Sequence, residues 1–84
     1  MNIRKKPSHP GEVLKREFIE HCNIEPYKLA KDLGWNYGKL EELLNGEINL
    51  TISSAMDLSK TLDLDPEFWI KIQEEWDEWK LVNP

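Results

Sequence analysis

The sequence contains a single cysteine and no long apolar run. Cys22 alone cannot form a disulfide within the chain, and it excludes a cysteine-based zinc site. No apolar stretch approaches the roughly 20 residues that a membrane-spanning helix needs. The basic segment Met1–Ser8 is not followed directly by the apolar segment of a secretory signal. We therefore expect a cytoplasmic protein with no membrane partner.

The sequence also lacks the signatures of a catalytic site. It has only four glycines and shows neither a phosphate-binding glycine loop nor a nucleophile elbow. No segment alternates apolar and polar residues, so no sheet is expected. With 84 residues, 39% of them hydrophobic and 32% charged, the chain fits one small globular domain. These features predict an all-α, non-enzymatic protein without a cofactor.

Charge is distributed unevenly along the chain. The net charge is -5, and it comes entirely from the second half. Residues 1–40 hold eight basic and five acidic side chains, net +3, whereas residues 41–84 hold three basic and 11 acidic ones, net -8. The asymmetry suggests one face for an anionic partner and another for a basic one.

Helical spacing and capping residues predict five helices. They begin at His9-Pro10, Glu25-Pro26, Asn36, Thr51 and Asp65-Pro66, and the first three end near Cys22, at Gly34 and at Asn45-Gly46. His9 is expected to help cap the first helix. The side chains expected to face the core are Val13, Leu14, Phe18, Cys22, Leu29, Ala30, Leu33, Leu40, Leu43, Leu44, Ile52, Ala55, Met56 and Leu62. Residues 1–8 are interpreted as a flexible basic arm and residues 9–84 as the domain.

The second and third helices have the spacing of a helix-turn-helix. Gly34 provides the tight turn between them, and Asn36 suits the start of the following helix. In such a unit the second helix lies in the DNA major groove. Gly38 weakens the first turn of that helix, which would allow close approach of a partner to the backbone or have no role.

Several segments together resemble the HigA antitoxins, which are lambda-repressor-like helix-turn-helix proteins also known as VapI or XRE-type regulators. The resemblance covers roughly residues 8–75. It implies a homodimer that represses its own operon and neutralises an mRNA-cleaving toxin of the RelE-like class. The segments that carry it are His9-Pro-Gly-Glu-Val-Leu14, Leu29-Ala30 with Gly34, Leu43-Leu-Asn-Gly46, Thr51 and Pro66-Glu-Phe-Trp69.

The resemblance also implies which residues meet operator DNA. The start of the third helix would read bases, and the start of the second would lie over the phosphate backbone. By position, the base-readout candidates are Asn36, Tyr37, Gly38, Lys39 and Glu42, and the backbone-contact candidates are Tyr27, Lys28, Lys31 and Asn45. Arg4, Lys5 and Lys6 either reach phosphates as an arm or form an ordinary disordered terminus.

The residues leave a second hypothesis open. Glu25-Pro26 stands where the family usually has Ser-Gln, and Pro26 has no N–H to offer a phosphate. Glu41, Glu42 and Glu47 each oppose phosphate binding, although Glu42 could accept from a cytosine amino group. The alternative is therefore a helix-turn-helix-fold interaction module that does not bind DNA, either a neutralising antitoxin or a mobile-element scaffold.

The fifth helix places four apolar residues at spacings of three, four and three. We interpret them as a homodimer seam; a toxin-facing patch and a fold-back onto the first helix are the alternatives. Phe68 and Trp69, the first of the four, are also expected to pack in the core. The acidic residues Glu74, Glu75, Asp77 and Glu78 suit either a basic toxin or a solvated face. The four residues of the seam are Trp69, Ile72, Trp76 and Trp79.

No metal site is expected. His9, His21 and Cys22 match no zinc spacing. The acids Asp63, Asp65 and Glu67 resemble a calcium loop only superficially, because Phe68 stands where glycine is required. They are explained instead as acids at the start of the fifth helix, where the helix dipole favours negative charge.

Overall fold

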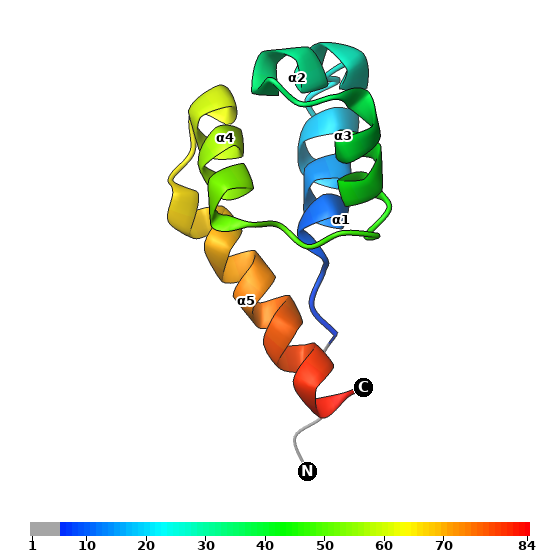
Figure 1. Ribbon diagram of the computed structural model, residues 1–84, viewed down its shortest axis with the longest axis vertical. Coiled ribbons are helices and arrows are strands. Elements are labelled where there is room, and N and C mark those ends of the chain that lie inside the picture. The colour runs from blue at the N-terminus through cyan, green and yellow to red at the C-terminus, as the bar shows by residue number, and fades with distance from the viewer. Residues whose placement is uncertain (1–5) are drawn as a thin grey trace.

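The computed structural model describes residues 6–84 and shows the expected five-helix all-α fold (Figure 1). No strand occurs among these residues. Residues 1–5 of the expected basic arm lie outside the described residues. The elements are α1 Pro10–Leu14, the π-helical segment η1 Lys15–Glu20, α2 Pro26–Leu33, α3 Tyr37–Leu44, α4 Ile52–Leu62 and α5 Pro66–Val82.

Each α-helix begins at a side chain that caps its free amides. Asn36 Oδ1 accepts from the Lys39 amide at 2.8 Å, Thr51 Oγ1 from Ser54 at 3.1 Å, and Asp65 Oδ1 from Glu67 at 2.9 Å. His9 caps α1, because its Nδ1 accepts from the Gly11 amide at 3.0 Å. These four caps confirm the helix starts expected from the sequence.

The first helix changes its winding partway along. After α1 the chain continues as η1, in which the His21 amide donates to the Arg16 carbonyl five residues earlier. Because a π-helical turn is wider than an α-helical turn, side chains four residues apart no longer lie on the same face of the helix. Phe18 therefore packs only partly against the core, and Cys22 is exposed, so the expectation that Cys22 is buried is wrong.

The core gathers one face of each helix. Leu14, Leu29, Leu40, Leu58 and Trp69 are almost completely buried. The Trp69 ring lies against Phe18 and Phe68, with centroids 5.7 and 5.0 Å away. Trp69 thus belongs to the core, as expected, and its assignment to a dimer seam is wrong because it offers no surface to a partner. Phe68 is 41% exposed, so the expectation that it packs in the core is wrong.

Helix α4 buries only part of the face expected from the sequence. Ile52 and Met56 are exposed, at 68% and 57%, so their assignment to the core is wrong. Ala55 is buried, as expected, and the buried side of α4 also carries Ser54, Leu58 and Ser59. Since α4 has apolar residues on two faces, the spacing of these residues does not by itself indicate which face is buried.

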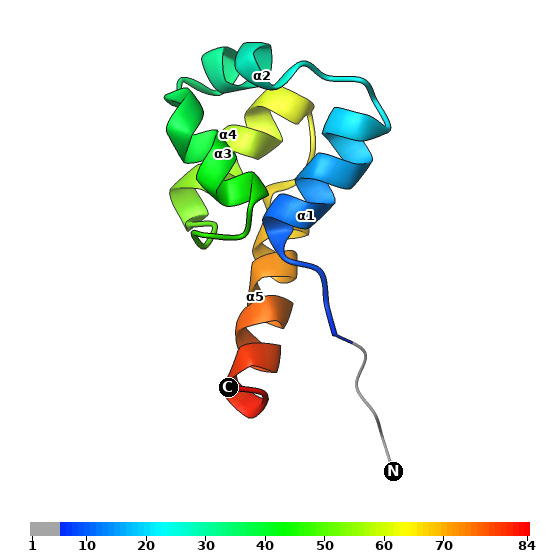
Figure 2. The same cartoon turned by 90° about the vertical axis from the view of Figure 1, so that its right-hand side faces the viewer.

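Close contact between α1 and α3 depends on Gly11. A Cβ at this position would overlap the Leu43 carbonyl oxygen and lie 2.6 Å from its carbonyl carbon. The absent side chain therefore lets the backbone of α1 touch the last turn of α3. Figure 2 shows these two helices side by side.

Helix α5 leaves the body and makes the molecule elongated, with extents of 44 × 21 × 21 Å (Figures 1 and 2). Gln73 joins it to the loop after α3: its Oε1 accepts from the buried Leu50 amide at 2.7 Å, and its Nε2 donates to Asp77 Oδ1 at 2.8 Å. No helix within residues 6–84 has the length and apolarity needed to cross a membrane.

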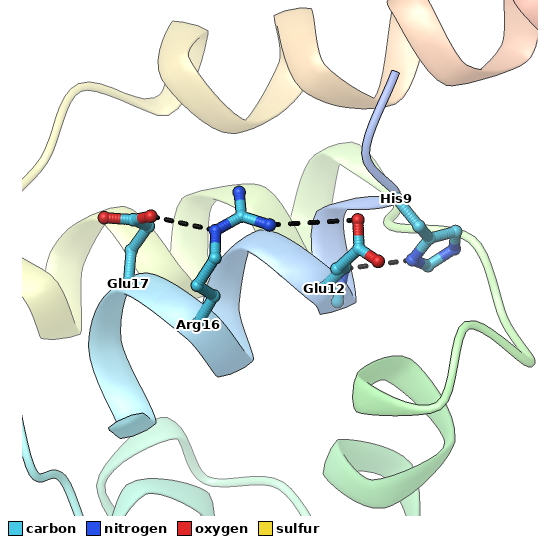
Figure 3. Close-up of polar contacts among 5 residues, drawn as sticks. His9, Glu12, Arg16 and Glu17 are labelled. Atoms are coloured by element: carbon cyan, nitrogen blue, oxygen red, sulfur yellow. Dashed lines mark hydrogen bonds and ion pairs between the residues drawn. The ribbon is translucent and has the colours of Figure 1, made fainter. Parts of the chain in front are cut away.

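The middle of α5 also contacts the start of α1. The Trp76 ring meets His9 edge-on at 5.3 Å and stacks with Trp79 at 5.9 Å, and the Lys6 ammonium lies 5.6 and 5.2 Å from the two indoles. Figure 3 shows the His9 ring beside the first turn of α1. Trp76 thus makes the contact with the first helix that was one of the three alternatives for these tryptophans, while both indoles remain partly exposed.

Candidate nucleic-acid interface

The end of the molecule opposite the C-terminus is formed by α2 and the start of α3 (Figure 1). Gly34 joins the two helices in the left-handed conformation, φ 75° and ψ 22°, and its amide bonds to the last turn of α2. The Trp35 amide donates to the Ala30 carbonyl at 3.0 Å, which closes the turn. The predicted helix-turn-helix is therefore present in the structure.

Trp35 fixes this turn onto the rest of the fold. Its indole is buried, and Nε1 donates to Asp57 Oδ2 on α4 at 2.9 Å. The Lys39 ammonium lies 4.3 Å from the centre of the same ring. Trp35 was not among the predicted site residues, although an apolar residue directly after the glycine of such a turn often packs against the preceding helix.

Two tyrosines lie together at the N-termini of α2 and α3. The rings of Tyr27 and Tyr37 stack with centroids 4.1 Å apart and planes 15° apart. Desolvation, followed by the nearby charge of Glu41 and by Tyr27 and Glu25, raises the pKa of Tyr37, so its hydroxyl is neutral at physiological pH. The structure thus joins one predicted backbone contact and one predicted base contact into a single aromatic unit.

The predicted cations lie on the same two helices as this unit but differ in the contacts that their ammonium groups make. Lys31 is exposed, Lys28 pairs with Asp32 at 3.5 Å within α2, and Lys39 covers the Trp35 indole. Exposed pairs such as that of Lys28 are weak, so a phosphate can compete for the ammonium. Three ammonium groups are therefore located on α2 and the first turn of α3.

The remaining predicted DNA contacts, for base readout and for the backbone, lie along α3 and at its two ends. Asn36 is engaged as the cap, and a Cβ at Gly38 would meet only Asn36 Oδ1, at 3.4 Å, so Gly38 leaves an open surface. Glu42 is exposed further along the helix. Asn45 caps the far end of α3, about 12 Å of helix away from Tyr37. The structure therefore does not bring Asn45 together with the tyrosine pair.

Glu25 was not among the predicted site residues. Its carboxylate accepts from the amides of Tyr27, at 3.1 Å, and Lys28, at 2.9 Å. Since Pro26 has no N–H, this carboxylate occupies both amides that the first turn of α2 could otherwise offer to an anion. Glutamate is an unusual capping residue, so only a weak signal for this contact is present in the sequence.

No family model matches the chain. It is 36% identical over 80 residues to the antitoxin HigA-1 of Vibrio cholerae, which covers 95% of this chain and 75% of that protein. It is 32% identical over 81 residues to an HTH-type transcriptional regulator of Haemophilus influenzae, covering 96% and 76% of the two chains.

The fold agrees with these relatives. The structure of the Pseudomonas aeruginosa antitoxin HigA with the higBA promoter superimposes with a TM-score of 0.86 at 26% identity, covering 92% of this chain and 84% of that one. A helix-turn-helix in a five-helix fold, together with sequence identity along nearly the whole chain, identifies the family. The chain belongs to the HigA family of helix-turn-helix antitoxins and transcriptional regulators.

Proposed function

We propose that this protein is an antitoxin that binds operator DNA of its own operon through α2 and α3 and neutralises a partner toxin. The observation that carries the proposal is the Tyr27–Tyr37 stack at the start of α2 and α3 of a helix-turn-helix, whose two helices also carry Lys28, Lys31 and Lys39. The Pseudomonas relative with promoter DNA supports the same use of the fold here. Such a regulator acts where the chromosome is, in the cytoplasm.

The helix arrangement supports a specific way of docking. The first residues of α3 would face the base edges in the major groove, and the ammonium groups of α2 would meet phosphates on either side. Because a dimer presents two such units, the operator would have two half-sites about 34 Å apart along the duplex.

The test is binding to the DNA upstream of the gene, measured by fluorescence anisotropy at low and at physiological salt. Lys39→Glu is expected to lower the affinity at least tenfold, because it removes a cation and adds a repulsive charge at the start of α3. Lys71→Glu, the same charge change on an exposed residue of α5, is expected to bind like the wild type. Equal affinities for the two variants would show that α3 is not the reading helix.

A second function is favoured by the negative charges near α3. Glu41, Glu42 and Glu47 are exposed, and Glu25 caps α2, so a module of this fold that neutralises a toxin without binding DNA is the alternative. Absence of binding at both salt concentrations by a folded wild-type protein would establish this alternative and exclude operator binding.

The toxin is proposed to be a basic, mRNA-cleaving nuclease of the RelE-like class. The net charge of -8 over residues 41–84 is complementary to such a partner. Co-expression with the toxin gene beside its own is expected to restore growth of the host cell. Unrestored growth with both proteins present in soluble form would contradict neutralisation.

A further inference from the structure

The two stacked tyrosines differ in how they are held by the rest of the fold. Tyr27 is 66% exposed, so its ring is not anchored in the core, and the flat face that it covers belongs to Tyr37. Tyr37 is the first residue of α3, and a Cβ at the adjacent Gly38 would contact only a side-chain oxygen of Asn36. Tyr37 is itself half-buried and packs partly against the core, so Tyr27 adds a second contact to a ring that the core holds only in part.

Restricting this ring matters for recognition. Tyr37 projects from the turn of α3 that would enter the major groove, and sequence is read there by groups held in fixed positions against base edges. A free tyrosine ring would lose rotamer entropy on binding, whereas a ring already stacked has lost it beforehand. A near-parallel stack at 4.1 Å supplies this restriction from a second helix.

We propose that Tyr27 is a positioning residue, which acts on DNA recognition by holding the Tyr37 ring rather than by contacting a phosphate through its own hydroxyl. The inference rests on the proposed operator binding. It changes the role expected for Tyr27 from backbone contact to support of base readout.

The two roles make different predictions for substitutions of Tyr27. Affinities are measured for the upstream DNA and for a scrambled duplex of the same length, and their ratio gives the specificity. Tyr27→Phe keeps the ring and is expected to retain the wild-type ratio. Tyr27→Ala removes the ring and is expected to lower the ratio about 2- to 10-fold, the range of an aromatic pair. Tyr37→Ala is expected to lower it as well, and the double variant no further than Tyr37→Ala alone.

Three outcomes would overturn the proposal. They are a loss in Tyr27→Phe as large as in Tyr27→Ala, an equal loss on both duplexes with an unchanged ratio, or additive losses in the double variant. Far-UV circular dichroism melts of each variant establish that the compared proteins are folded.

A measurement without DNA tests the stack separately. The Tyr37 ring protons in NMR spectra are expected to be shifted upfield in the wild type and in Tyr27→Phe, and to move toward free-tyrosine values in Tyr27→Ala. Unshifted protons in the wild type would contradict the stack and hence the proposal, whatever the DNA affinity. A shifted wild type that binds both duplexes equally would instead contradict operator recognition, and with it any role of Tyr27 in readout.

Discussion

At the residue scale, Glu25 has two opposing effects. Its carboxylate completes the first turn of α2 through the Tyr27 and Lys28 amides, which stabilises the helix. The same negative charge stands at the helix end that would face a phosphate, where it repels the DNA and occupies the amides.

Removing this charge is expected to strengthen DNA binding. Glu25→Ser retains a good capping residue, so the fold is preserved while the affinity for upstream DNA rises, by roughly threefold or more at low salt. Glu25→Asp keeps both cap and charge and should bind like the wild type, as should Glu67→Gln, which removes an exposed charge from α5. If Glu25→Ser and Glu67→Gln change the affinity equally, only the net charge matters.

His9 links the stability of the fold to pH. Burial lowers the pKa of His9, although the Ile48 carbonyl and the charges of Glu12 and Asp77 oppose the shift. Neutral His9 accepts the Gly11 hydrogen bond at Nδ1, a bond that protonation of this atom would remove. Because the pKa is lower in the folded than in the unfolded state, the contribution of His9 is complete above about pH 6.5 and is lost as the pH falls through the folded value.

The free energy of unfolding, measured by denaturant titration, is therefore expected to be lower at about pH 5.5 than at about pH 7.5, with the fall beginning near pH 6.5. His9→Asn retains a capping side chain that does not titrate, so its stability should change less over the same interval. His21→Asn, at an exposed position, is the matched control and should keep the wild-type dependence. Identical pH profiles for all three proteins would show that His9 does not cause the change.

At the element scale, the contact between α1 and α3 depends on Gly11, because a glycine has no side chain to keep the two backbones apart. Gly11→Ala would force the two backbones apart, because the new methyl group meets the Leu43 carbonyl rather than a flexible side chain. We expect a loss of more than about 2 kcal/mol in the free energy of unfolding.

Gly38→Ala is the matched control for this substitution. Its methyl group would approach only Asn36 Oδ1, at 3.4 Å, and alanine favours the helix by up to about 1 kcal/mol. In thermal melting, Gly38→Ala should therefore be at least as stable as the wild type. A Gly11→Ala protein of wild-type stability would mean that α1 and α3 are not in backbone contact.

The elements themselves could be predicted from the sequence to a large extent. Caps at Asn36, Thr51 and Asp65 and the left-handed Gly34 are local features, and they determined where the helices begin and turn. The exposure of Cys22 could not be predicted, because it depends on the π-helical winding of η1.

The surfaces were harder to predict than the elements. The exposed Ile52 and Met56 depend on which face of α4 meets α5, and this is decided by tertiary packing. Tyr27 and Tyr37 are ten positions apart and lie on two helices joined by a turn. The spacing of residues within one helix gives no indication that their rings meet. The carboxylate of Glu25 at the α2 amides likewise became evident only from the three-dimensional arrangement.

At the scale of the whole molecule, the projecting part of α5 is the feature that a second copy could cover. Ile72, Trp76 and Trp79 are partly exposed there, and Leu81 is 81% exposed beyond them. A small monomer rarely leaves such a surface open, so we predict a homodimer through this helix.

Trp79→Glu is expected to convert the dimer into a monomer in sedimentation velocity, with the helical content unchanged because Trp79 lies outside the core. Met56→Glu places the same charge on an exposed apolar residue of α4 and should remain dimeric. Dissociation of Met56→Glu but not of Trp79→Glu would locate the seam on α4 instead.

The hydrogen bonds of Gln73 have a mechanical consequence. One amide side chain on α5 holds the Leu50 backbone, in the segment that runs from the end of α3 to α4. Moving α5 relative to the body would break this bond and leave a buried N–H without a partner, which is unfavourable by about 1–3 kcal/mol. A binding partner that shifts α5 would therefore also displace the segment between α3 and α4, at the residue directly before the Thr51 cap of α4.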